Sequence, residues 1–499
     1  MNMFKKRITL LNIISNIILQ FVNILSWFII PKIILSYFGS SVNGLVSSIS
    51  QFLSYISLVE GGVTSVVMAC LYKPLISKDQ KKISSIMKTS QLFYRKIGLI
   101  FIAYSFILAI IYPVVVNTGY SYLYVFTLVI ILSFSLMIQY MYSLTYRNLL
   151  NASKKVYIIS FTQSLILILT IILSYISVKI YPNIHFLKII SGLLFILQPV
   201  IYSKYINKSF DIDFNAVEDK HLIKQRWNGF AINIAAFIHN CTDVSLLTFF
   251  TNLATVSIYS VYAIVTNGLR AIINAISSAI VPTIGITYAS ENDNKLNKKM
   301  DIYEYVVFIA VYFSFTIAGL LITPFVMIYT KDITDANYFQ PLFGILMIIS
   351  EALYLLKMPH LNLAYSANKF KELSKYAYIE ATINIVVSVC LVYNYGLIGV
   401  TIGTIVAMIY RMITQVHFTK RLIKSRNVAT YYKKIFIFSV TTIIGVVICA
   451  LLIPSAKFNI ISWITNGMIY SAIFGILYLV MSIIFFNDEL NYIKKYLKH

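Results

Sequence analysis

Charged residues are scarce in this chain of 499 residues, of which only 12% are Asp, Glu, Lys or Arg while 59% are hydrophobic. Soluble globular proteins carry about 25% charged residues, so this composition could not cover a water-soluble surface. Cysteine is scarce too, and its four residues, Cys70, Cys241, Cys390 and Cys449, lie singly in apolar segments. Their spacing excludes a disulfide framework and a cysteine metal site, and we expect no cofactor.

Hydrophobic stretches fill the chain instead. A helix that crosses the roughly 30 Å hydrocarbon core of a bilayer needs about 20 mostly apolar residues. Fourteen such segments lie near residues 8–31, 43–68, 97–117, 122–146, 156–178, 189–203, 229–250, 255–286, 305–329, 339–358, 376–394, 396–417, 435–453 and 459–485. The pattern predicts an all-α integral membrane protein with about 14 transmembrane helices.

Lys and Arg collect in alternate loops, as expected when cytoplasmic loops retain positive charge. With the N-terminus inside, 33 of the 41 Lys and Arg residues fall in cytoplasmic segments and five in external ones. We therefore expect both termini to be cytoplasmic. The same distribution explains the net charge of +23, because basic loops at a membrane face anionic lipids. A basic chain can also indicate nucleic-acid binding, but the location of these charges in the loops favours the membrane.

The loops are too short for a soluble catalytic domain. The longest external ones lie around residues 32–42 and 179–188, and no Gly-rich loop ends in Gly-Lys-Ser or Gly-Lys-Thr, so an ATP-driven pump would need a separate subunit. We expect a transporter and not an enzyme. A membrane glycan polymerase or ligase, the nearest enzyme class, would be expected to carry a long external loop.

A faint internal repeat relates the two halves of the chain. Residues 35–39 (LSYFG) resemble residues 247–251 (LTFFT), and Leu45 precedes Asp79 by the same spacing as Tyr259 precedes Asp293. An even number of helices separates the copies, so the halves run parallel, related by an axis along the membrane normal. Helices 13 and 14 are then an addition. Chance similarity between apolar helices is the alternative reading.

Short motifs at equivalent places carry a family resemblance. In the first half they are residues 31–39 (PKIILSYFG), 43–45 (NGL), 58–63 (LVEGGV) and 73–75 (KPL), and in the second half 240–243 (NCTD), 256–259 (VSIY) and Pro282. With these motifs the chain resembles the polysaccharide-biosynthesis flippases, the Wzx-like branch of the superfamily that also contains the MATE multidrug exporters.

The resemblance implies two six-helix bundles around a central cavity. The expected organisation is an N-terminal bundle at 1–206, a cytoplasmic linker at 207–228, a C-terminal bundle at 229–417, and a basic loop with helices 13 and 14 at 418–499. The implied substrate is an oligosaccharide on polyprenyl pyrophosphate, flipped from the inner to the outer leaflet of a bacterial cytoplasmic membrane for capsule or O-antigen synthesis. A polysaccharide polymerase is a further expected partner. The alternative is a MATE-like, ion-coupled exporter of small organic molecules, which would need a negatively charged cavity.

Charged side chains inside the predicted spans are the candidates for a polar path, because charge at membrane depth is costly and turns inward. Seven residues qualify, namely Glu60, Asp243, Arg270, Glu351, Lys357, Glu380 and Arg411. Lys357, Glu380 and Arg411 lie near predicted cytoplasmic ends, where long side chains can instead extend to the interface.

Polar stripes accompany these charges. Helix 1 carries Asn12, Asn16, Gln20 and Asn23 at spacings of four, four and three, and helix 7 carries Asn233, His239, Asn240 and Asp243 within one arc. Helix 8 adds Asn267, Arg270 and Asn274, while helix 2 has Glu60 beside a serine-rich face. Such stripes either hydrogen-bond helices to one another or line a wet cavity, and their repetition in equivalent helices favours a cavity built by helices 1, 2, 7 and 8.

Roles follow from side-chain chemistry. A guanidinium offers paired donors that match phosphate, so Arg270 is the expected pyrophosphate anchor, with Lys357 and Arg411 as further contacts and Asn12, Asn16, Asn23, Asn240, Asn267 and Asn274 for sugar hydroxyls. Arg270 neutralising Asp243 is the competing, purely structural reading. Asp243, Glu60, Glu351 and His239 are the candidates for coupling to H⁺ or Na⁺, since a buried carboxylate can change its charge state between conformations.

Overall fold

The structure is a computed structural model that describes residues 2–60, 63–219, 241–290, 292–452 and 458–497. Every regular element among these residues is helical, which confirms the predicted all-α fold. Eleven of the helices are long and apolar enough to cross a membrane. The chain divides into two compact units: the first holds described residues within 1–237 and Asn252–Ser257, and the second holds those within 238–251 and 258–499.

Two of the long helices combine predicted spans, and the seventh predicted span is not among the eleven, which together account for fourteen spans. Helix α1 (Asn2–Leu53) bends at Gly39, where φ is 80° and ψ is 178°, and α15 (Phe370–Thr419) bends at Gly396, where φ is 50°. Glycine adopts positive φ without the steric cost that a Cβ would bring. The seventh predicted span is described only over Cys241–Phe250.

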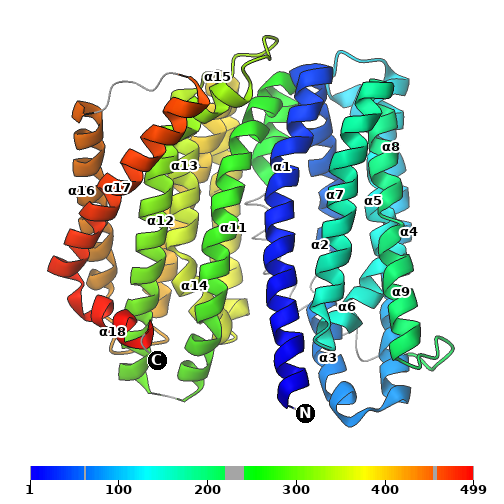
Figure 1. Cartoon of the computed structure of the whole chain (residues 1–499), viewed down its shortest axis with the longest axis horizontal. Coiled ribbons are helices and arrows are strands. Elements are labelled where there is room, and N and C mark those ends of the chain that lie inside the picture. The colour runs from blue at the N-terminus through cyan, green and yellow to red at the C-terminus, as the bar shows by residue number, and fades with distance from the viewer. Residues whose placement is uncertain (1, 61–62, 220–240, 291, 453–457, 498–499) are drawn as a thin grey trace. The chain divides into compact units, whose positions relative to one another are not determined.

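The N-terminal unit continues from α1 through further helices joined by short connections. These are η1 (Ser54–Ile56), α2 (Ser57–Glu60), α3 (Val63–Ser77), α4 (Gln80–Val115), α5 (Tyr122–Ile138), the π-helical turn η2 (Gln139–Ser143), α6 (Leu144–Ala152), α7 (Val156–Ile180), α8 (Ile184–Leu194) and α9 (Leu197–Ser209). The long helices run roughly alongside one another (Figure 1). Helix α4 begins with a cap, since the Asp79 carboxylate accepts the Lys82 backbone N–H at 3.0 Å.

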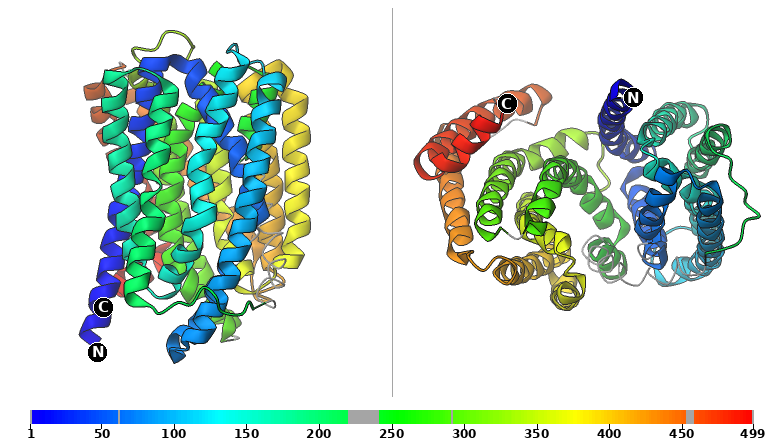
Figure 2. Two further views of the ribbon diagram at one scale, coloured as in Figure 1. Left: turned by 90° about the vertical axis from the view of Figure 1, so that its right-hand side faces the viewer. Right: turned by 90° about the horizontal axis from the view of Figure 1, so that it is seen from below.

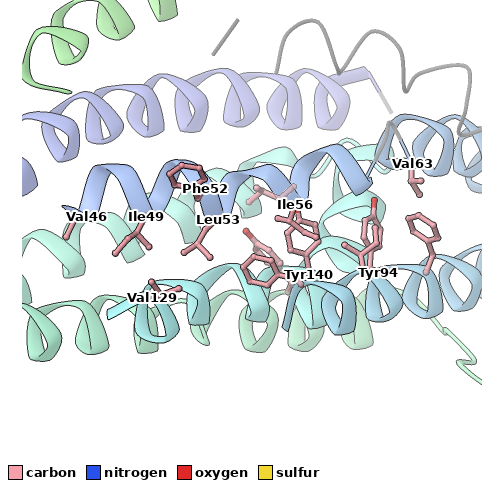
Figure 3. Packing of buried hydrophobic residues seen from close by; sticks show 14 of the residues in the cluster. Val46, Ile49, Phe52, Leu53, Ile56, Val63, Tyr94, Val129 and Tyr140 are labelled. Atoms are coloured by element: carbon pink, nitrogen blue, oxygen red, sulfur yellow. The ribbon is translucent and has the colours of Figure 1, made fainter. Parts of the chain in front are cut away.

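One face of the second half of α1, continued into η1, contributes to the core of this unit. Val46, Ile49, Leu53 and Ile56 follow helical spacing and are buried. Figure 3 shows these side chains directed at the neighbouring helices that carry Val129 and Tyr140. The packing therefore holds the second half of α1 against α5 and η2, the elements that carry Val129 and Tyr140.

The C-terminal unit is organised around α12. Its helices are α11 (Leu253–Ala289), α12 (Asp293–Tyr329), α13 (Pro341–Leu356), α14 (Met358–Ser366), α15, α16 (Val428–Leu452), α17 (Ile460–Phe485) and α18 (Asn487–Leu497). Helix α12 packs against α13, α14, α16, α17 and α18. The two added helices, α16 and α17, lie along one flank of α12 (Figure 2).

The first turn of α11 packs inside the N-terminal unit, although the rest of the helix belongs to the C-terminal unit. Asn43 Nδ2 donates to Ser257 Oγ at 2.8 Å. A Cβ at Gly44 would lie 1.8 Å from the backbone oxygen of Leu253, so only glycine permits this close approach.

Candidate functional site

A chain of charged side chains crosses the C-terminal unit, beginning with the partly buried Arg270 on α11. Its Nε donates to Glu351 Oε2 of α13 at 2.8 Å, and its Nη2 donates to Glu351 Oε1. This two-pronged geometry is the arrangement that a guanidinium and a carboxylate favour. The structure therefore pairs Arg270 with Glu351, whereas the competing sequence interpretation paired it with Asp243.

Lys357, Glu380 and Arg411 continue this chain. Lys357 Nζ lies 3.4 Å from Glu380 Oε1, and Arg411 Nε lies 3.2 Å from Glu380 Oε2. All three residues are between 2% and 6% exposed, so they are internal ion pairs and do not extend to a membrane interface. Tyr354 joins the two groups, since its ring lies 5.2 Å from the Arg270 guanidinium and 4.7 Å from Lys357 Nζ.

Among the described residues of this group of ion pairs, cations outnumber carboxylates. Arg270, Lys357 and Arg411 supply three cations, while Glu351 and Glu380 supply two carboxylates. A buried cation in excess is costly unless an anion accompanies it. The group is therefore suited to receive a further negative charge.

Asp243 belongs to a separate hydrogen-bond network within the same unit. Its carboxylate accepts from Tyr259 Oη at 3.0 Å and from Thr404 Oγ1 at 3.0 Å. Asn384 Nδ2 donates to Thr404 Oγ1 at 3.0 Å, and the Val400 carbonyl accepts from Thr404 at 3.2 Å. The network gathers oxygen atoms from the seventh span and the two halves of α15.

The Asn384 side chain carries a buried oxygen that the structure leaves unsatisfied. Asn384 is 2% exposed, and its Oδ1 has no hydrogen-bond partner among the described residues. A buried polar atom without a partner indicates a missing ligand, water or ion. Asp243, Thr404 and Asn384 thus bring a carboxylate, a hydroxyl and an amide into one hydrogen-bond network, and oxygen atoms are the ligands that hard cations favour.

Glu60 is the centre of a polar group in the N-terminal unit. Thr64 Oγ1 donates to its Oε1 at 2.5 Å, Thr64 also lies 2.8 Å from Tyr94 Oη, and Asn148 Nδ2 donates to Tyr94 at 3.0 Å. Figure 3 shows the Tyr94 hydroxyl pointing from α4 toward the helix that begins at Val63. Tyr140 lies on the π-helical turn, a local distortion that is frequent at functional sites.

Asn12 and Asn16 of α1 form hydrogen bonds within the N-terminal unit. Asn12 donates to the Lys154 carbonyl at 2.8 Å and accepts from the Tyr157 N–H at 2.8 Å, while Asn16 accepts from Ser160 at 2.8 Å. These bonds tie α1 to α7, as expected of polar residues that hold membrane helices together. Asn23 is half-buried.

The remaining predicted contacts lie on α11 and on the seventh span. Asn267 and Asn274 are exposed on the stripe of α11 that carries Arg270. Asn233, His239 and Asn240 lie outside the described residues. A cavity between helices 1, 2, 7 and 8 stays a prediction.

An apolar groove of about 430 Å³ lies against α13 in the C-terminal unit. Its walls come from α12 (including Val311 and Phe315), α13 (Ile345, Ile348, Ala352) and α16 (Ile435, Val446). At about 100° per residue, these α13 positions lie about 120–180° around the helix from Tyr354 and about 60–120° from Glu351. The apolar groove therefore lies across α13 from Tyr354 and beside Glu351.

Sequence reasoning missed a second buried cluster, centred on Glu304 of α12. Lys434 Nζ lies 3.0 Å from Glu304 Oε2, His360 Nε2 lies 2.9 Å from Glu304 Oε1, and Arg426 Nη2 contacts the same carboxylate. Asp301, one turn earlier, pairs with both Arg426 and Lys434. The predicted span began near residue 305, so Asp301 and Glu304 were assigned to a loop. In the structure α12 begins at Asp293, and both residues lie within the helix.

Asn384 was missed for another reason. Glu380, Asn384 and Ser388 are spaced by four, which places them on one face of a helix. The same stripe analysis that singled out helices 1, 7 and 8 would have identified this face.

Comparison with solved structures shows what this fold resembles. The lipid II flippase MurJ in an inward closed conformation matches with a TM-score of 0.74 at 16% identity, over 96% of this chain and 100% of that one. An inward-facing multidrug resistance MATE family transporter of the MOP superfamily matches with a TM-score of 0.63 at 14% identity, over 81% of this chain and 96% of that one. A Vibrio cholerae MATE transporter in the bent form matches with a TM-score of 0.53 at 14% identity, over 85% and 96%.

These likenesses show a shared fold. No family model matches the sequence, and no curated protein matches it.

Proposed function

We propose that this protein is a flippase that moves a polyprenyl-pyrophosphate-linked oligosaccharide from the inner to the outer leaflet of a bacterial cytoplasmic membrane. The observation that carries the proposal is that buried cations and an apolar groove lie near the same helix, α13. Arg270 with Glu351, and Lys357 and Arg411 with Glu380, form a cationic face with one more cation than carboxylates, and the apolar groove lies against Ile345, Ile348 and Ala352 of α13. An amphiphile with a charged head and a hydrocarbon tail matches both features.

The cationic face is the proposed pyrophosphate site. Transfer of a pyrophosphate into hydrocarbon is prohibitive unless protein groups replace its hydration, and guanidinium groups match phosphate oxygens. Binding requires Arg270 to share or exchange its bonds to Glu351. A MATE-like exporter of organic cations, the alternative function, is disfavoured by this surplus of cations.

The apolar groove is the proposed site for the polyprenyl tail. Burial of apolar surface in the groove is favourable only where the walls fit the chain, because the competing environment is lipid and not water. Helix α16, one of the two helices beyond the twelve of the repeated bundles, supplies one wall. This gives α16 a role in substrate recognition.

Asp243 is the proposed coupling site. When Asp243 is ionised, it balances the surplus positive charge of Arg270, Lys357 and Arg411, and when it binds H⁺ or Na⁺ the surplus returns. The free energy of substrate binding then differs between the two states, which is what coupling requires. Asn384 and Thr404 complete the oxygen set around Asp243. Glu60 is the corresponding candidate in the N-terminal unit.

A deletion strain tests the proposed function. Loss of the protein should remove a surface polysaccharide while lipid-linked repeat units accumulate on the cytoplasmic side. Plasmid-borne wild type should restore display, and Arg270→Ala should not. Normal surface polysaccharide in the deletion strain, together with increased sensitivity to organic cations, would favour the exporter.

A further inference from the structure

The buried charges around Glu304 lie at the point where α16 joins the C-terminal unit. Glu304 is fully buried, and the side chains of Arg426 and Lys434 are 2% and 5% exposed. Arg426 Nη1 also donates to Asn297 Oδ1 at 2.6 Å, and the Lys424 N–H donates to Asp293 Oδ2 at 3.1 Å. The segment between α15 and α16 is thus held along the first turns of α12.

A helix at the edge of a membrane bundle needs specific contacts to hold it in place, and the Glu304 cluster supplies them. Lipid tails are as apolar as leucine, so the hydrophobic effect does not drive one membrane helix against another. Most of α16 is apolar, and its side chains could contact lipid as favourably as they contact other helices. Specific polar contacts must therefore fix its position and its rotation.

The cluster is connected directly to the groove wall. Lys434 precedes Ile435, which lines the groove together with Ser439, Thr442 and Val446 on one face of α16. Tyr431 Oη donates to the carbonyl of Leu356, another lining residue, at 3.1 Å. Tyr312 of α12 lies in the groove and contacts Ser439 Oγ at 3.0 Å. A shift or rotation of α16 at Lys434 would therefore change the width and shape of the groove.

We propose that Glu304, Asp301, Arg426 and Lys434 are positioning residues that set the groove wall and thereby determine how strongly the protein selects a long polyprenyl tail. The inference rests on the proposed function, which assigns the tail to this groove. Their role is indirect, since they hold α16 in the orientation that presents Ile435 and Val446 to the groove.

Lys434 provides the sharpest test, because its neighbour Lys433 is exposed and serves as a matched control. Purified protein is titrated in detergent with undecaprenyl pyrophosphate and with farnesyl pyrophosphate, and binding is measured by native mass spectrometry. Wild type should prefer the long tail by about tenfold or more, a difference of about 1.4 kcal/mol in binding free energy. Lys434→Met should reduce this preference several-fold while the affinity for farnesyl pyrophosphate stays unchanged.

Lys434→Arg retains the charge and can still contact both Asp301 and Glu304, so it should keep the wild-type preference, as should Lys433→Met. Glu304→Gln, which keeps the side-chain volume, gives an independent variant should Lys434→Met fail to fold. An unchanged ratio in folded Lys434→Met or Glu304→Gln would overturn the positioning role, and so would an equal loss of both affinities. Failure of the wild type to bind either pyrophosphate would overturn the proposed function itself.

Discussion

At the scale of single residues, the central feature is a partly buried guanidinium that already has a carboxylate partner. Arg270 and Glu351 form a two-pronged pair, and Tyr354 extends it toward Lys357. Removing one member of such a pair costs about 3–5 kcal/mol, whereas replacing both with apolar residues is often neutral. Stability and transport can therefore be separated by comparing single and double variants.

We predict that Arg270→Ala lowers thermal stability and abolishes transport, because it leaves Glu351 buried without its partner. The double variant Arg270→Met/Glu351→Met should recover most of the lost stability, measured by thermal unfolding in detergent, but none of the transport. Arg270→Lys should transport partially, since lysine keeps the charge and loses the fork. Normal transport by the double variant would contradict the anchor role.

Asp243→Asn should separate binding from transport. The amide fixes the neutral state of the coupling site, so we expect undecaprenyl pyrophosphate still to bind while net flipping falls to background. The measurement is flipping in proteoliposomes with an imposed pH gradient and, separately, an imposed sodium gradient. Unchanged flipping by Asp243→Asn would remove this carboxylate from the mechanism and direct attention to Glu60.

At the scale of elements, the fold could be predicted from sequence because apolar length alone determines membrane spans. The bends at Gly39 and Gly396 were not predicted, since they depend on a local positive φ rather than on hydrophobicity. The pairing of Arg270 with Glu351 could not be predicted either. This pair joins α11 to α13. The periodicity of one helix shows which face is polar, but it does not show which residue of another helix that face contacts.

The close approach of α1 to α11 predicts how a substitution at Gly44 affects stability. Gly44→Ala would place its Cβ 1.8 Å from the Leu253 oxygen, so the helices must move apart, at a cost of about 1–3 kcal/mol. We expect a lower melting temperature for the purified variant. Gly268→Ala on α11 is the control, because a Cβ there meets nothing within 4 Å, and it should unfold no earlier than wild type. Equal melting of Gly44→Ala and wild type would refute the close approach.

At the scale of the whole molecule, the orientation in the membrane rests on the distribution of Lys and Arg. Ser425 lies in a predicted cytoplasmic segment and Thr334 in a predicted external one, and both side chains are exposed. In a background with the exposed Cys390 replaced by serine, cysteine introduced at Thr334 should react with an impermeant thiol reagent in intact cells. Cysteine introduced at Ser425 should react only after the membrane is opened, and the reverse pattern would invert the topology.

The measurement that tests the central claim most directly is flipping by the purified protein in proteoliposomes. Lipid-linked oligosaccharide extracted from the accumulating deletion strain is incorporated, and its movement between leaflets is followed by accessibility to an impermeant glycan-modifying enzyme. Wild-type protein should make the inner pool accessible, whereas Arg270→Met/Glu351→Met, although folded, should leave it protected. Protection of the inner pool with wild type, or equal flipping by the double variant, would contradict the account.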